Sequence, residues 1–171
     1  MKSRLGAWLG SFVFFWIAPA TVGGLIPYLL TDWRTEPPLL GGSLGRILGG
    51  LLIAGGTAAV VESFARFAIQ GRGTPAPIAQ TERLVVSGLY RHVRNPMYVG
   101  VLAAIVGQAV LLGRVVLLGY AALVWLLFHS FVLLYEEPTL RSRFGASYDG
   151  YRAGVRRWRP RLTPWQDASR R

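Results

Sequence analysis

Four long apolar runs restrict the fold of this chain more than any other feature. They predict helices over about 5–30, 43–69, 96–113 and 115–136. A helix needs about 20 apolar residues to cross roughly 30 Å of hydrocarbon. The first, second and fourth runs have that length, and the shorter third run can cross with little tilt. The sequence therefore predicts an all-α, polytopic membrane protein with about four transmembrane helices, built as a single domain over 1–171.

The charge content agrees with a membrane protein. Only 16% of the residues are charged, whereas soluble domains have about 25%. The net charge of +11 could indicate nucleic acid, but the arginines lie between and after the apolar runs, as expected for contact with anionic lipid headgroups. We therefore predict the lipid bilayer as a partner and no nucleic acid. The chain has no cysteine, which excludes thiolate metal sites, and we predict no metal.

The first run has a second interpretation. Lys2, Arg4, the apolar residues that follow and the small residues at 18–20 resemble a cleavable signal peptide. However, the run continues to Leu30, well beyond any such cleavage site. We favour a retained helix.

The distribution of basic residues predicts the orientation. With four crossings, one side of the membrane holds every lysine and arginine except Arg34, Arg46 and Arg114. The positive-inside rule makes this side cytoplasmic. We expect both termini, the loop 70–95 and the segment 138–171 in the cytoplasm of a cell whose plasma (inner) membrane holds the helices. Arginine greatly exceeds lysine, which points to a GC-rich, bacterial source.

The second run contains two local signals. Gly45 and Gly49 have the small-xxx-small spacing that lets helices approach closely in lipid. Glu62 and Arg66 are four residues apart on one helical face, so we expect them to neutralise each other.

A tight turn links the third and fourth runs. Gly113-Arg114 is the only break between them, so they form an antiparallel hairpin whose far ends lie on the same side of the membrane. The hairpin brings the segment 88–100 close to the acidic pair Glu136-Glu137. Arginines beside paired carboxylates would suit a ligand that carries both signs of charge.

The ordered residues of these two segments carry a resemblance. The run 88–100 reads GLYRHVRNPMYVG, and the second block continues from the acidic pair through Leu140, Phe144-Gly145, Tyr148, Tyr151 and Val155. Together they resemble the signature of isoprenylcysteine carboxyl methyltransferases and related phospholipid methyltransferases, over about 82–160.

The resemblance implies a membrane-embedded methyltransferase that uses S-adenosylmethionine and releases S-adenosylhomocysteine. It implies a cytoplasmic cofactor pocket at the end of the last helices, closed by a short C-terminal lid. The residues that it assigns to the cofactor are Tyr90, Arg91, Arg94, Asn95, Tyr98, Gly100, Glu136, Glu137, Tyr148 and Tyr151. The prenylcysteine enzymes typically have histidine where this chain has Asn95, and asparagine cannot take up a proton at neutral pH.

The chemistry that the residues themselves support is positioning. A sulfonium methyl donor is already activated, so the protein chiefly aligns the reacting atoms. Arg94 and Glu137 are the candidates for a direct catalytic role, and we assign no base. The acceptor is expected to be lipophilic, without a choice among carboxylate, amine, hydroxyl and thiol. His129 is either a functional ionisable group or a neutral partner in an interhelical hydrogen bond.

Two other functions remain as alternatives. One is a membrane-embedded, NADPH-dependent reductase of the sterol-reductase type, whose C-terminal region has a similar pattern. The other is a small four-helix transporter without enzymatic activity. A transporter needs a carboxylate deep in the membrane, whereas Glu62 lies near the cytoplasmic end of its run. The sequence assigns no oligomeric state.

Overall fold

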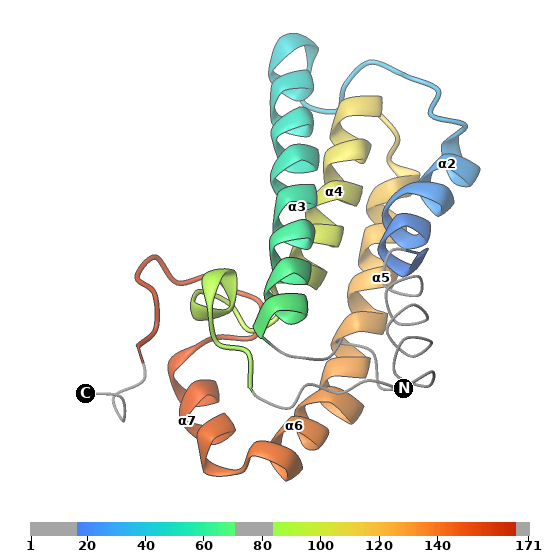
Figure 1. Ribbon diagram of the computed structural model, residues 1–171. Helices are drawn as coiled ribbons and strands as arrows, with labels where there is room; N and C mark the ends of the chain where they lie inside the picture. The colour runs from blue at the N-terminus through green and yellow to red at the C-terminus, as the bar shows by residue number, and fades with distance from the viewer. Residues whose placement is uncertain (1–16, 71–83, 167–171) are drawn as a thin grey trace, which may run out of the picture.

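The computed structural model describes residues 17–70 and 84–166, and all the regular elements in these ranges are helical (Figure 1). In chain order they are the π-turn η1 (Thr21–Leu25), α2 (Ile26–Thr31), α3 (Gly42–Gln70), the 3-10 turn η2 (Gly88–Arg91), α4 (Pro96–Leu112), α5 (Val116–Phe131), the π-turn η3 (Val132–Glu136), α6 (Glu137–Phe144) and α7 (Ala146–Gly154). The start of the predicted first helix, with the signal-peptide question, lies outside the described residues.

Two helices of the described part are long and apolar enough to cross a membrane, Gly42–Arg66 and Val116–Phe144. Two shorter apolar helices, Ile17–Thr31 and Pro96–Leu112, accompany them. Apolar side chains stay exposed on the outer faces of the long helices: Leu51 is 64% exposed and Leu134 is 81% exposed. Large exposed apolar surfaces mark contact with a membrane or with another protein. Together with the length and composition of these helices, they support a membrane protein.

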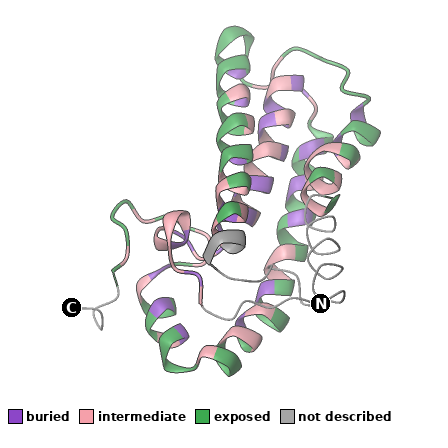
Figure 2. Ribbon diagram, in the orientation of Figure 1, coloured by how far each residue is buried: buried purple, intermediate pink, exposed green. Residues whose placement is uncertain are grey.

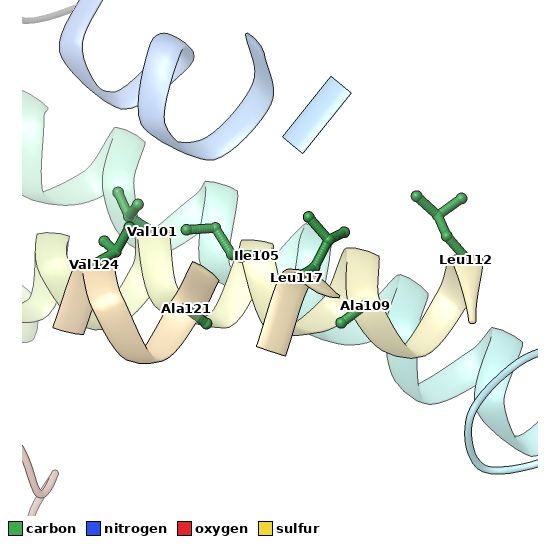
Figure 3. Close-up of a cluster of buried hydrophobic side chains, with 7 residues drawn as sticks. All are labelled: Val101, Ile105, Ala109, Leu112, Leu117, Ala121 and Val124. Atoms are coloured by element: carbon green, nitrogen blue, oxygen red, sulfur yellow. The ribbon is translucent and has the colours of Figure 1, made fainter. Parts of the chain in front are cut away.

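The predicted hairpin between α4 and α5 is present. Gly113 ends α4 with a φ of 71°, a conformation that glycine adopts without strain. A Cβ at this position would also meet the carbonyl oxygen of Pro37. The facing sides of α4 and α5 form the main apolar core (Figure 3), which contains Val101, Ile105, Ala109, Leu112, Leu117, Ala121 and Val124.

Helices α3 and α4 touch through their backbones. A Cβ on Gly56 would meet the backbone oxygen of Gly100, and a Cβ on Gly49 would lie 2.9 Å from the backbone oxygen of Gly107. The small-residue contact therefore uses glycines seven residues apart on each helix. Gly45, which the sequence paired with Gly49, instead lies against Pro38 in the loop before α3.

Side chains of the α4–α5 hairpin form hydrogen bonds with the helix at Ile17–Thr31. Gln108 Nε2 donates to the carbonyl oxygen of Gly23 at 2.7 Å, and the Tyr120 hydroxyl donates to that of Val22 at 2.9 Å. Both acceptors belong to the π-turn η1, and Pro27 follows Gly23 by four residues and Val22 by five. Because proline has no N–H, it cannot pair with either carbonyl, so both stay available to the side chains. Gln108 and Tyr120 therefore make polar contacts across the bundle.

The fourth predicted helix extends beyond its expected end at 136. The π-turn η3 follows α5 directly, and the N–H of Glu137 donates to the carbonyl oxygen of Val132, five residues earlier. Pro138 then lies in the first turn of α6. A proline has no N–H and clashes with the carbonyl four residues before it. The wider π-turn changes the hydrogen-bond register at this point, so the helix continues to Phe144.

The short elements η2, α6 and α7 lie at the end of the molecule opposite the Gly113 turn (Figure 1). Tyr148 and Tyr151 of α7 and Val155 are buried together, packed against Leu84, Val86 and Trp165 among others. Buried residues follow α4 and the inner side of α7, whereas the outer side of α3 is exposed (Figure 2). Residues 155–166, here called the C-terminal strap, follow α7 without regular structure.

Candidate functional site

The segment before α4 meets the start of α6 through an ion pair. Arg94 precedes the N-cap of α4, and Glu137 is the first residue of α6. Arg94 Nη1 lies 3.0 Å from Glu137 Oε1, and each side chain is only 10% exposed. The two segments that the hairpin was expected to bring together are therefore in direct contact at one end of the bundle.

A second arginine binds the same carboxylate. Arg157 of the strap donates from Nε to Oε1 of Glu137 at 2.6 Å and from Nη2 to Oε2 at 2.9 Å. This paired geometry is the strong form of a charge-assisted hydrogen bond. The hydrogen bond to Glu137 raises the pKa of the Arg157 guanidinium above its ordinary value. Glu137 thus joins three segments: the loop before α4, α6 and the strap.

The neighbouring carboxylate points to a different partner. The hydroxyl of Tyr98, in the first turn of α4, donates to Oε2 of Glu136 at 3.1 Å. The Tyr98 ring packs against Phe128 of α5, with ring centroids 4.5 Å apart. The two adjacent glutamates therefore present one carboxylate to two arginines and the other to a tyrosine.

The residues described so far, Arg94, Tyr98, Glu136, Glu137 and Arg157, form a polar cluster. Two tyrosines of α7 complete it. The Tyr148 hydroxyl accepts from Arg94 Nη1 at 3.3 Å, and the Tyr151 hydroxyl donates to the carbonyl oxygen of Tyr90 at 2.7 Å. Burial raises the pKa of both Tyr148 and Tyr151 above the ordinary value. Both phenols therefore stay protonated at neutral pH and remain able to donate.

One donor of this cluster is unused. The Nε of Arg94 is buried and has no acceptor among the described residues. A buried donor without a partner costs free energy. Arg94 therefore offers an N–H that a bound anionic group could satisfy.

The strap lies along the segment before α4. Backbone N–H groups pair with carbonyl oxygens at 2.9 Å in three places: Arg94 to Arg156, Arg161 to His92, and Trp165 to Arg91. Side chains add to this ladder, because Arg91 Nε donates to the carbonyl oxygen of Trp165 and Asn95 Nδ2 to that of Arg157. The predicted site residues Arg91 and Asn95 therefore hold the strap in this structure.

Two site contacts were missed by reasoning from the sequence. Arg157 binds Glu137, and Trp158 Nε1 donates to Nδ1 of His129 at 3.0 Å. The charge balance could have signalled the first contact, because a buried carboxylate requires cations. Nothing in the local sequence of Trp158 indicated the second.

Not every predicted residue lies in the polar cluster. Gly100 is packed against α3, where a Cβ would lie 2.6 Å from the carbonyl oxygen of Gly56. The part of the chain that the structure describes contains no group of three or more His, Cys, Asp or Glu residues placed to hold a metal ion. A surface hollow on α6, lined by Pro138, Thr139, Ser142 and Arg143, shares no residue with the cluster.

Comparison with known proteins gives a family and a relative. A family described as phospholipid methyltransferase matches residues 44–147. The protein-S-isoprenylcysteine O-methyltransferase of Schizosaccharomyces pombe (strain 972 / ATCC 24843) is 42% identical over 72 residues, which are 42% of this chain and 30% of the relative. The match thus spans less than a third of the relative's length. The family match contains both Arg94 and the paired glutamates.

Proposed function

Because this chain belongs to the phospholipid methyltransferase family, we propose that it is a membrane-embedded methyltransferase that uses S-adenosylmethionine. The acceptor is a lipophilic or membrane-associated molecule, methylated where the cytoplasm meets the membrane. The observation that carries this proposal is the meeting of Arg94 with Glu137, beside the pair Tyr98–Glu136, at one end of the helical bundle.

The proposed topology has four crossings. The helices at Gly42–Arg66 and Val116–Phe144 cross by length and composition, and the shorter apolar helices at Ile17–Thr31 and Pro96–Leu112 cross beside them. The excess of arginine at the polar end of the bundle makes that end cytoplasmic. Both termini then lie in the cytoplasm, and the protein resides in the plasma (inner) membrane of a bacterium.

The polar cluster has the groups that S-adenosylmethionine requires. The cofactor carries a carboxylate, an ammonium, a sulfonium and two ribose hydroxyls, so it needs both signs of charge nearby. The unused Nε of Arg94 suits the carboxylate. Glu136 and Glu137 suit the hydroxyls and the cationic groups. The proposed wall around them consists of Tyr90, Arg91, Asn95, Tyr98, Tyr148 and Tyr151.

The chemistry asked of the protein is alignment. The bound cofactor supplies a methyl group that is already activated by its positive sulfur. The residues of the cluster hold the cofactor in one orientation, and the strap excludes water from it. Holding two reactants in the reactive geometry can lower a barrier by about 7–11 kcal/mol. A carboxylate acceptor requires no base, whereas an amine, hydroxyl or thiol has to lose a proton.

The acceptor reaches the site from the bilayer. The Schizosaccharomyces pombe relative is by its name an O-methyltransferase of protein S-isoprenylcysteine, which is a lipid-bearing group. This chain has Asn95 before the proline of α4, where the prenylcysteine enzymes typically have histidine. We therefore propose a lipophilic acceptor of the same broad class, without assigning its reactive group.

The decisive experiment compares two ligands. Purified protein in detergent is titrated calorimetrically with S-adenosylhomocysteine and, separately, with NADPH. We expect binding of the first and none of the second. Binding of NADPH alone would replace the proposal with a reductase, and substrate uptake by proteoliposomes that depends on Glu62 would replace it with a transporter.

A second experiment identifies the acceptor. The protein is incubated with a lipid extract and S-adenosylmethionine that is labelled in its methyl group. We expect label in the lipid fraction, and mass spectrometry of the labelled species then gives the acceptor. Glu137→Gln is the matched control, and it should transfer less label because it binds the cofactor more weakly.

A further inference from the structure

Two consecutive residues of the strap are held by two residues of one membrane helix. Arg157 binds Glu137 through both carboxylate oxygens, and Trp158 donates to Nδ1 of His129. The His129 ring also stacks on Trp125, with ring centroids 5.0 Å apart and planes 20° apart. His129 is therefore held between a stacking ring of its own helix and a hydrogen bond from the strap.

The π-turn η3 makes this double contact possible. His129 and Glu137 are eight residues apart, and in an uninterrupted α-helix, at about 100° per residue, they would point about 80° away from each other. A π-turn accommodates about one extra residue, so residues eight apart across it are in phase like residues seven apart in an α-helix. The turn at Val132–Glu136 therefore brings His129 and Glu137 to the same face.

We propose that His129 is a positioning residue for the strap. Through Trp158 it fixes the strap so that Arg157 closes on Glu137 and the strap covers the cofactor site. His129 does not contact the cofactor and acts only through the strap. This inference rests on the function proposed above, because it assigns a part of the same site.

The hydrogen bond restricts which side chains can replace His129. The indole N–H of Trp158 can only donate, so position 129 has to supply an acceptor where Nδ1 now lies. The Oδ1 of asparagine occupies nearly the same position relative to the backbone, whereas leucine has the bulk but no acceptor. His129→Asn should therefore keep the strap in place, and His129→Leu should release it.

Hydrogen exchange in the cofactor-free protein tests the proposal directly. The reporters are the strap amides that pair with the segment before α4, those of Arg161 and Trp165. We expect exchange at these amides to rise about five- to tenfold in His129→Leu and in Trp158→Phe, the effect of one lost hydrogen bond. His129→Asn should exchange like the unchanged protein. Amides of α4 serve as the folding control in each variant.

A second measurement connects the strap to the cofactor. Calorimetry should show that His129→Leu and Trp158→Phe weaken S-adenosylhomocysteine binding by a similar factor, and that His129→Asn does not. The double variant should lose no more than either single variant, because both remove the same contact. Trp33→Phe, at the other end of the molecule, is the matched control and should change neither measurement.

The outcomes separate this inference from the proposed function. If Trp158→Phe leaves strap exchange unchanged, or His129→Asn behaves like His129→Leu, the positioning role is overturned whatever the enzyme does. If strap exchange responds as expected but the unchanged protein binds no S-adenosylhomocysteine, the proposed function fails and the contact between His129 and the strap remains. Should His129→Leu not fold, Trp158→Phe alone decides.

Discussion

Glu137 is the one carboxylate among the described residues that is buried. Its side chain is 10% exposed and binds the guanidinium groups of Arg94 and Arg157. Breaking a buried ion pair from one side leaves an uncompensated charge, which is costly. Substitutions of Glu137, Arg94 or Arg157 should therefore have large effects on ligand binding at the site.

Glu137→Gln should weaken the binding of S-adenosylhomocysteine at least tenfold. The amide keeps the shape of the side chain but loses the charge that pairs with the arginines, and hydrogen bonds to charged groups contribute about 1.5–3 kcal/mol. Calorimetry on folded protein in detergent measures the change. Glu36→Gln, an exposed carboxylate at the far end of the molecule, is the control, and unchanged affinity in Glu137→Gln would remove this residue from the site.

Arg94→Ala should cost more cofactor affinity than Arg157→Ala. Arg94 is the more buried of the two, with 10% of its side chain exposed against 24%, and it alone has a buried donor without a described partner. The ratio of the two dissociation constants gives the result. The reverse order would mean that the cofactor lies on the strap side of Glu137.

Tyr151→Phe should destabilise the protein by about 1 kcal/mol, the usual contribution of one hydrogen bond. Burial raises the pKa of Tyr151 in the folded state, so its contribution is fully present below the unfolded pKa of about 10 and is lost as the pH rises beyond it. Thermal unfolding should therefore show a constant difference from pH 6 to 9 that narrows in more alkaline buffer. A difference that grows with pH would contradict this assignment.

Among the elements, the contact between α3 and α4 is the closest. Two glycines on each helix allow backbone to meet backbone, which is how helices associate in lipid, where apolar burial alone gives little driving force. The face of α3 on which a glycine lies decides whether it contacts α4. Gly49 and Gly56 face α4, whereas Gly50 and Gly55 have no atom within 4 Å of an added Cβ.

Gly56→Ala should destabilise the helix pair by about 1–3 kcal/mol, the usual cost of adding a methyl group where there is no space. Gly50→Ala is the matched control, and it should be neutral or slightly stabilising because alanine is the better helix former. Unfolding in mixed micelles measures both. Equal effects would show that the two helices are not held by this contact.

The elements also show what sequence reasoning can and cannot supply. The single break at Gly113-Arg114 was sufficient to predict the hairpin, and the hairpin was sufficient to predict that Arg94 would meet the acidic pair. The π-turn η3 has no signature in composition or periodicity. In a regular α-helix His129 would be in phase with Glu136, seven residues later, whereas in the structure the strap binds His129 and Glu137.

At the scale of the whole molecule, the orientation across the membrane is the principal prediction. The chain has no cysteine, so a single introduced thiol reports its own location. Ser147→Cys in α7 should react with an impermeant maleimide only after the cells are opened. Thr35→Cys, in the loop before α3, should react in intact cells. The opposite pattern would invert the protein in the membrane.

The glycine contact between α3 and α4 also limits how a lipid can reach the site. Where two backbones touch, no acyl or prenyl chain can pass between them, so this flank of the bundle is a closed wall. A lipophilic acceptor from the bilayer would have to enter the site between other helices, which are separated by side chains rather than by backbones. The close contact between α3 and α4 thereby excludes one route by which a lipid could reach the site.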